Sequence, residues 1–193
     1  MLGFGAGDGA ELAPLAPHIS HLTVVESSTN YEQWPGFSSP VDYVPASPEG
    51  NLSLPDAEFD LVTSFGVLHH IPNVSHVLGE LARVTKPGGL LLLREPTVSM
   101  GDWAAPRAGL TAHERGLPRG WLRDALAISG YSIVVKHELG MPLTRRLIFS
   151  ARRWAVDVDL AASWVASANW RYHATSQVQK LRPTSMSIVA RKV

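Results

Sequence analysis

The sequence predicts an α/β fold: a doubly wound, mostly parallel seven-stranded sheet with its last strand antiparallel. Three observations predict it. Short apolar, β-branched segments alternate with helical segments along most of the chain. Residues 90–93 are apolar at every position, as in a strand covered on both faces. Residues 186–190 follow a long excursion rather than a simple crossover, so this strand is expected to pair antiparallel at an edge.

Composition sets limits on the class of protein. The chain has 193 residues, enough for a single domain over 1–193, and its formal net charge is zero. A neutral chain has no overall attraction to nucleic acid or to an anionic membrane. It contains no cysteine, which excludes disulfides, thiolate nucleophiles and cysteine zinc sites and fits a cytoplasmic protein. No apolar run is long enough for stable membrane insertion; a homo-oligomer stays open.

The first half of the chain alternates strands with one helical segment. Apolar residues recur at helical spacing from Ala10 to Ala16, and Pro17 ends that segment. The second strand is β-branched and ends at the acid Glu26. A short helix is expected within 27–40. Strands are expected at 1–4, 22–25, 41–44 and 59–64.

The second half continues the alternation. Apolar residues from Val74 to Val84 recur at offsets of three and four, which predicts a helix that starts at Pro72 or Asn73 and stops at Pro87-Gly88-Gly89. Pro118 suits the first turn of a helix that Gly130 ends. A long irregular connection covers 96–117, and a Trp-rich helical insertion covers 140–183. Strands are expected at 90–93, 131–135 and 186–190.

A glycine loop and one acid form a candidate nucleotide site. Gly5, Ala6, Gly7 and Gly9 lie between the first strand and the first helical segment. Glycines there allow a tight turn and close approach of the backbone to a ligand, at which the helix would point its free N–H groups. An acid at Glu26 can accept hydrogen bonds from both hydroxyls of a ribose. The same pattern serves NAD and S-adenosylmethionine, so it leaves the cofactor open.

The block from Leu54 to Ile71, closed by Lys86-Pro87-Gly88-Gly89, resembles the central block of class I S-adenosylmethionine-dependent methyltransferases. The resemblance covers residues 1–95 well and 118–193 in outline, and implies a Rossmann-like fold with S-adenosylmethionine as cofactor. Gly50-Asn51 matches the turn that contacts adenine, and Ser64-Phe65-Gly66 matches the strand end beside the methionine and the methyl group. The implied cofactor contacts are Gly5, Ala6, Gly7, Gly9, Glu26, Asn51, Ser64 and Phe65.

Two features depart from this resemblance. Gly3 stands where the family usually has an acid, and the chain begins almost inside the first strand, where the family usually has a preceding helical segment. These features motivate a second hypothesis, a non-catalytic, N-terminally truncated methyltransferase-like module that binds a partner. An NAD-dependent Rossmann enzyme is the third. At the helix-to-strand junction, Arg83 is expected to be solvated and to do no chemistry.

The resemblance implies methyl transfer to a small-molecule acceptor, and we expect a hydroxyl of a sugar-like or other metabolite. A hydroxyl needs a base, and histidine is the best suited because its pKa is near 6.5. His69, Glu95 and His113 are the expected catalytic residues, with His70 and His173 as further candidates. No metal is expected, because the sequence places no third ligand near the two adjacent histidines. The connection 96–117 is expected to contact the acceptor, with Trp103 suited to stacking on a sugar.

Overall fold

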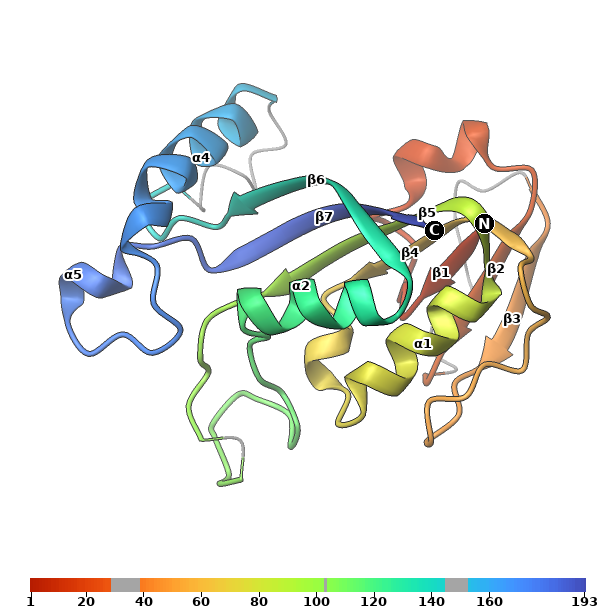
Figure 1. Cartoon of the computed structure of the whole chain (residues 1–193), viewed down its shortest axis with the longest axis horizontal. Helices are drawn as coiled ribbons and strands as arrows, with labels where there is room; N and C mark the ends of the chain where they lie inside the picture. Colours follow the sequence, from red (N-terminus) through yellow and green to blue (C-terminus); the bar gives the residue numbers. More distant parts are fainter. Residues whose placement is uncertain (29–38, 103, 145–152) are drawn as a thin grey trace.

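The computed structural model describes residues 1–28, 39–102, 104–144 and 153–193. Seven strands form one sheet of order β3-β2-β1-β4-β5-β7-β6 (Figure 1). Neighbouring strands are parallel except that β7 runs antiparallel to both β5 and β6. The predicted fold class is confirmed, although β7 lies inside the sheet and β6 forms the edge. The strands are β1 Leu2–Phe4, β2 Leu22–Glu26, β3 Val41–Pro45, β4 Phe59–Phe65, β5 Thr85–Pro96, β6 Tyr131–Leu139 and β7 Ser185–Lys192.

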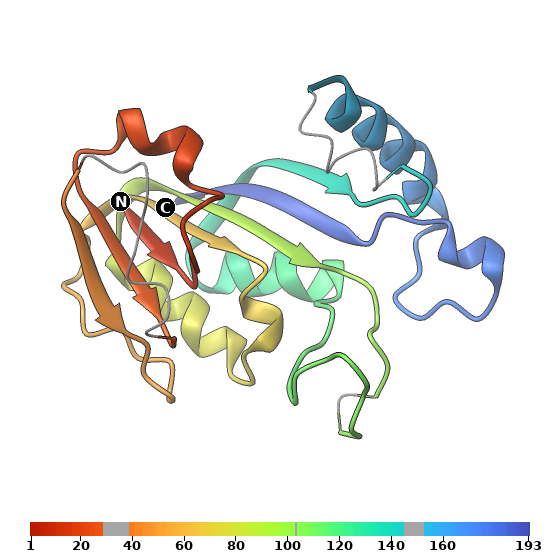
Figure 2. The same ribbon diagram turned by 180° about the vertical axis from the view of Figure 1, so that it is seen from behind.

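The helices α1 and α2 pack on one face of the sheet, and α4 lies beside β6 at its far end (Figures 1 and 2). The short helix expected within 27–40 falls largely on residues 29–38, outside the described residues. Within the described part, no helix combines the length and the apolar character needed to cross a bilayer. The helices are η1 Ala13–His18, η3 Leu68–His70, α1 Val74–Val84, α2 Arg119–Ile128, α4 Arg153–Ala166, η4 Ser167–Asn169 and α5 Gln177–Lys180.

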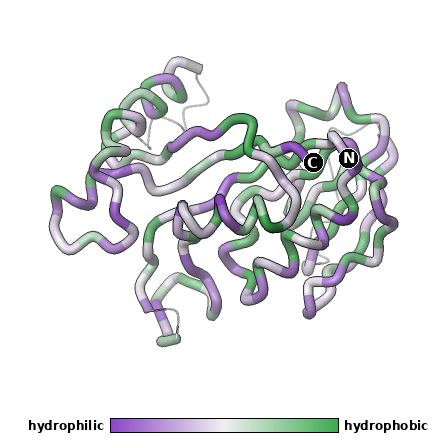
Figure 3. Tube along the Cα trace, in the orientation of Figure 1, coloured by the Kyte–Doolittle hydropathy of each residue, from purple (hydrophilic) through white to green (hydrophobic). Residues whose placement is uncertain are grey.

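Each face of the sheet has its own core. The larger core joins the inner sides of α1 and α2 to strand residues such as Phe4, Val62 and Leu91. The smaller one packs Leu12 of the glycine-loop region on Leu22 and Val24 of β2. The apolar stretches of the chain gather in the sheet and its helices, and the connecting loops are more polar (Figure 3). The strands β1 and β2 are thereby packed on both faces of the sheet.

The α-helix predicted over 10–16 is wrong. The chain forms turns after the glycine loop and then the 3-10 helix η1, which includes Pro14 and Pro17. Proline has no N–H to donate, and its ring clashes with the preceding turn of an α-helix. The expected row of free helical N–H groups behind the glycine loop is therefore not formed.

The strand predicted at 90–93 is longer and less buried than expected. It spans Thr85–Pro96, with Leu91, Leu93 and Glu95 buried and the residues between them only partly buried. Burial thus alternates with the period of a strand covered mainly on one face. The predicted turn at Pro87-Gly88-Gly89 belongs to this strand, and α1 ends before it at Val84.

Arg83 is not simply solvated, which corrects the expectation for it. Its guanidinium donates to the carbonyls of Leu52, at 2.8 Å, and Leu54, at 2.9 Å, and pairs with Glu80 at 2.8 Å. The Glu80 carboxylate in turn accepts the Leu52 N–H at 2.9 Å. These contacts tie α1 to the loop that carries Asn51, so the junction helps to position the site.

Glu80 gives this junction a pH dependence. The hydrogen bond from Arg83, followed by the one from the Leu52 N–H, lowers the pKa of Glu80 from 4.5 to about 2. A depressed carboxyl pKa stabilises the fold above pH 4.5, and this contribution is lost as the pH falls from 4.5 toward 2. We expect Glu80→Gln to lower the unfolding free energy by about 1 kcal/mol at pH 7. Urea unfolding from pH 7 to pH 2 measures it, with exposed Asp124→Asn as control; a difference that does not shrink in acid contradicts the assignment.

Candidate active site

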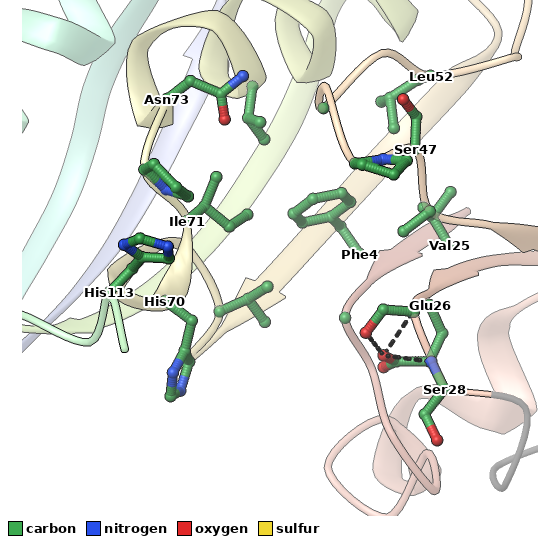
Figure 4. Close-up of a pocket in the computed structure, with 18 of the residues that line it drawn as sticks. Phe4, Val25, Glu26, Ser28, Ser47, Leu52, His70, Ile71, Asn73 and His113 are labelled. Atoms are coloured by element: carbon green, nitrogen blue, oxygen red, sulfur yellow. Dashed lines mark hydrogen bonds between the residues drawn. The ribbon is translucent and has the colours of Figure 1, made fainter. Parts of the chain in front are cut away.

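A cavity of about 820 Å³ opens at the carboxyl ends of β1, β2 and β4. These ends flank the point where the strand order reverses between β1 and β4, the usual ligand site of open α/β sheets. Phe4 and Val25 lie on one side of the cavity, and Ile71 and His70 on the other (Figure 4). Its volume is within the range of small-molecule sites, about 300–1,000 Å³.

The glycine loop and Glu26 converge at this cavity. Gly5, Gly7 and Glu26 all line it, and the Gly7 N–H donates to Glu26 Oε2 at 3.1 Å. Glu26 Oε1 accepts from the Ser27 N–H at 2.7 Å. Gly5 and Gly7 have φ values of +64° and +54°, which favour glycine. A Cβ on Gly7 would meet no heavy atom within 4 Å, so the loop leaves open space beside the carboxylate.

Asn51 lines the same cavity from the loop before β4. His76 Nε2 donates a hydrogen bond to the Asn51 Oδ1 at 2.8 Å, so the amide is held by α1. Leu52 and Val77 add apolar surface beside it. An apolar slot with a carboxylate at one end and an amide at its side fits an adenosine group.

The other predicted cofactor contacts lie outside this cavity. Ala6 and Phe65 line a smaller pocket of about 230 Å³, which shares Phe4, Gly5 and Gly7 with the cavity. Gly9 is buried and forms a turn, with its N–H donating to the Ala6 carbonyl at 2.9 Å. Ser64 is buried in β4, and its hydroxyl has no partner in the described part of the chain. The structure therefore brings together Gly5, Gly7, Glu26 and Asn51, but not these four.

Glu95 is buried beneath the loop after β4 and does not line the cavity. Its carboxylate accepts the N–H groups of Val67 at 3.0 Å, Leu68 at 2.9 Å and His69 at 3.3 Å. It also faces His69 Nδ1 at 2.7 Å. These contacts make Glu95 an anchor for the loop that forms one wall of the cavity.

His70, rather than His69, lines the cavity, together with His113. Successive residues of a 3-10 turn point about 120° apart, so neighbours in η3 face different surroundings. The Arg115 N–H donates to the His69 carbonyl at 2.9 Å, which docks the 111–115 segment on η3 and carries His113 to the cavity. Figure 4 shows His70 and His113 on the same side of the cavity. The two histidines differ in which way they point from the 3-10 turn. A sequence pattern over three residues does not fix that direction.

Burial, and then the neighbouring His69, lowers the pKa of His70 below 6.5. The ring is therefore neutral near pH 7 and able to accept a proton. We expect its Cε1 proton to titrate in NMR spectra with a midpoint below that of a free histidine peptide. Because the pKa of His70 is lower in the folded than in the unfolded chain, its contribution to the free energy of unfolding is complete above pH 6.5. That contribution is lost as the pH falls below 6.5. The replacement His70→Gln should remove the loss of unfolding free energy that His70 causes below pH 6.5. An NMR midpoint above 6.5 would contradict the burial described for His70.

A third potential metal ligand does lie near the two adjacent histidines, contrary to the expectation from the sequence. Glu114 supplies a third group: ligand atoms of His69, His70 and Glu114 lie within 4.8 Å of one another. Each residue already has protein partners, since His69 Nδ1 faces Glu95, and both His70 Nδ1 and Glu114 face Thr111, at 2.8 and 3.0 Å. These partners, Glu95 and Thr111, hold the three side chains without an ion, and a metal-free site stays a prediction.

Packing accounts for Gly3. A Cβ at this position would lie 3.0 Å from the Ala6 Cβ and 3.1 Å from Leu12 Cδ1, on the face of the smaller core. An acid there would enter apolar packing rather than the cavity. The lack of a side chain at Gly3 therefore allows Ala6 of the glycine loop and Leu12 to pack closely against β1.

Comparisons with known proteins agree with this geometry. Residues 2–93 match the family described as "Methyltransferase domain". A sterol 24-C-methyltransferase of Eremothecium gossypii is 31% identical over 56% of this chain and 31% of that protein. A ubiquinone biosynthesis O-methyltransferase of Thiobacillus denitrificans is 29% identical over 62% of this chain and 48% of that protein. The chain thus spans half or less of the length of these relatives.

A solved S-adenosylmethionine-dependent methyltransferase of Mesorhizobium loti has the same fold. Its TM-score is 0.66 at 18% identity, covering 99% of this chain and 90% of that one. The antiparallel β7 also departs from the parallel 3-2-1-4-5-6 order of dinucleotide-binding sheets. The chain therefore has the Rossmann-like fold of class I methyltransferases, a class that depends on S-adenosylmethionine, and its first half matches the methyltransferase domain family, as the sequence predicts.

Proposed function

We propose that the chain is an enzyme that transfers the methyl group of S-adenosylmethionine to a hydroxyl of a small, sugar-like or otherwise hydroxylated metabolite. The observation that carries the proposal is that Gly7 and Glu26 meet at the 820 Å³ cavity, where the Gly7 nitrogen lies 3.1 Å from Glu26 Oε2. Glu26 would accept the ribose hydroxyls, and Asn51 would meet the adenine edge. Ala6, Gly9, Ser64 and Phe65 would support the cofactor from behind the loop and strand end.

Bound S-adenosylmethionine supplies an electrophilic methyl group on its sulfonium. The protein has to place the acceptor, exclude water and take up the hydroxyl proton. His113 and His70 line the cavity and are suited to the last task. Glu95 and His69 would act by positioning this wall. In this proposal 1–193 is one domain, 96–117 contacts the acceptor, and 140–183 is a helical insertion.

A transfer assay with a labelled methyl group and a panel of monosaccharides and phenols tests the proposal. We expect label in a hydroxylated product, and a fall in kcat of about 100-fold in the double variant His70→Ala/His113→Ala, with unchanged affinity for S-adenosylhomocysteine. Exposed His18→Ala serves as the control. Cofactor binding without transfer to any acceptor in the panel favours the non-catalytic module instead.

A further inference from the structure

A further pocket, distinct from the two at the glycine loop, lies where the chain leaves β5 and enters β7. It has a volume of about 420 Å³, and its lining includes Ser99, His173, Lys180, Arg182 and Thr184. None of its lining residues is acidic, and none also lines the cofactor cavity. Since β7 runs antiparallel to β5, both segments meet at the same edge of the sheet as that cavity. The pocket is thus a separate, basic site on the ligand-binding edge.

Arg182 is the unusual member of this pocket. Arg182 is only 6% exposed, yet it forms no ion pair with any described residue. The guanidinium donates to the carbonyl of Gln179 at 2.7 Å and to that of Tyr172 at 3.4 Å, and its buried Nε has no partner in the described part. Burial lowers the pKa of Arg182. A buried cation is normally paired with an anion, and this one lacks a protein anion.

The groups around Arg182 are those that bind oxyanions. Lys180 adds an exposed ammonium, and it too forms no ion pair among the residues described. Ser99 Oγ accepts from the Gly101 N–H at 3.3 Å, which leaves its own proton free to donate. A planar guanidinium, an ammonium and a hydroxyl together match the charge and the hydrogen-bond acceptors of a phosphate. We propose that this pocket binds a phosphate-type oxyanion, free or as part of a larger molecule.

Titrations of the ¹⁵N-labelled chain at constant ionic strength test this inference. Inorganic phosphate should saturably shift amide signals of 99–101 and 180–184. Lys180→Gln should weaken binding about threefold, and Arg182→Lys about tenfold, because lysine lacks the two-pronged geometry. Exposed Lys136→Gln on β6 is the matched control and should bind phosphate like the wild type. Glucose 1-phosphate is the second probe: tighter binding than phosphate assigns the oxyanion to a larger molecule, and equal or weaker binding assigns it to the free ion.

Absence of saturable shifts with both probes overturns the proposal and leaves Arg182 as a tie between backbone carbonyls. Equal weakening by Lys136→Gln and Lys180→Gln also overturns it, since that result reflects net charge alone. If Arg182→Lys does not fold, the amide shifts of the wild type and the phosphate affinity of Lys180→Gln still test the proposal. The inference does not depend on methyl transfer, and a separate titration with S-adenosylhomocysteine keeps the two failures distinct.

Discussion

Gly5→Ala is expected to lower the unfolding free energy by about 3 kcal/mol and to weaken S-adenosylhomocysteine binding at least tenfold. Gly5 has φ +64°, where a side chain is strained, and a Cβ would lie 2.5 Å from Val67 Cγ2 and 2.6 Å from Val67 Cγ1. The loops after β1 and β4 would therefore have to separate at the cavity. Urea unfolding followed by circular dichroism measures the stability, and calorimetry measures the affinity.

Two variants show whether this contact is the cause. Gly79→Ala lies in α1 with no heavy atom within 4 Å of the new Cβ, and it should stabilise the fold by up to about 1 kcal/mol. The double variant Gly5→Ala/Val67→Ala relieves the overlap and should recover part of the loss. If Gly5→Ala binds as the wild type does, the two loops do not meet as described.

Glu95→Ala is expected to cost about 3–5 kcal/mol of stability. It would leave the N–H groups of Val67, Leu68 and His69 buried without their acceptor, and His69 Nδ1 without its partner. Loss of these contacts should also loosen the cavity wall and weaken S-adenosylhomocysteine binding. Exposed Glu58→Ala should change stability by less than about 0.5 kcal/mol.

Glu95→Gln separates anchoring from acid–base catalysis. The amide keeps one oxygen for the loop N–H groups but turns a donor toward them or toward His69, so a loss of about 2 kcal/mol is expected. Cofactor affinity should fall together with stability. A variant that folds and binds normally while kcat alone collapses would instead make Glu95 a chemical base.

Much of the fold follows from the sequence because its signals are local. The apolar spacing from Val74 to Val84 places α1, and Pro118 and Gly130 bracket α2. Prolines override the helical pattern in η1, where Pro14 and Pro17 remove two N–H donors. The position of β7 between β5 and β6 depends on long-range pairing that no local pattern encodes.

The site is predictable where one element end fixes it. Gly5, Gly7 and Glu26 follow β1 and β2 directly, and parallel strands bring such ends together. The choice of His70 over His69 depends on the phase of a three-residue turn, and the role of Glu95 depends on how the loop folds over β5. Arg182 draws attention only once its burial without an acid is known. Contacts between distant segments thus account for what the sequence left open.

Calorimetric titration with S-adenosylhomocysteine tests the central claim most directly, because Glu26 and the glycine loop are proposed to hold the nucleoside. The wild type should bind one equivalent, and Glu26→Ala should bind about 10- to 100-fold more weakly, with Glu58→Ala unchanged. A folded wild-type chain that gives no binding, or a Glu26→Ala variant that binds as tightly as the wild type, would contradict the account.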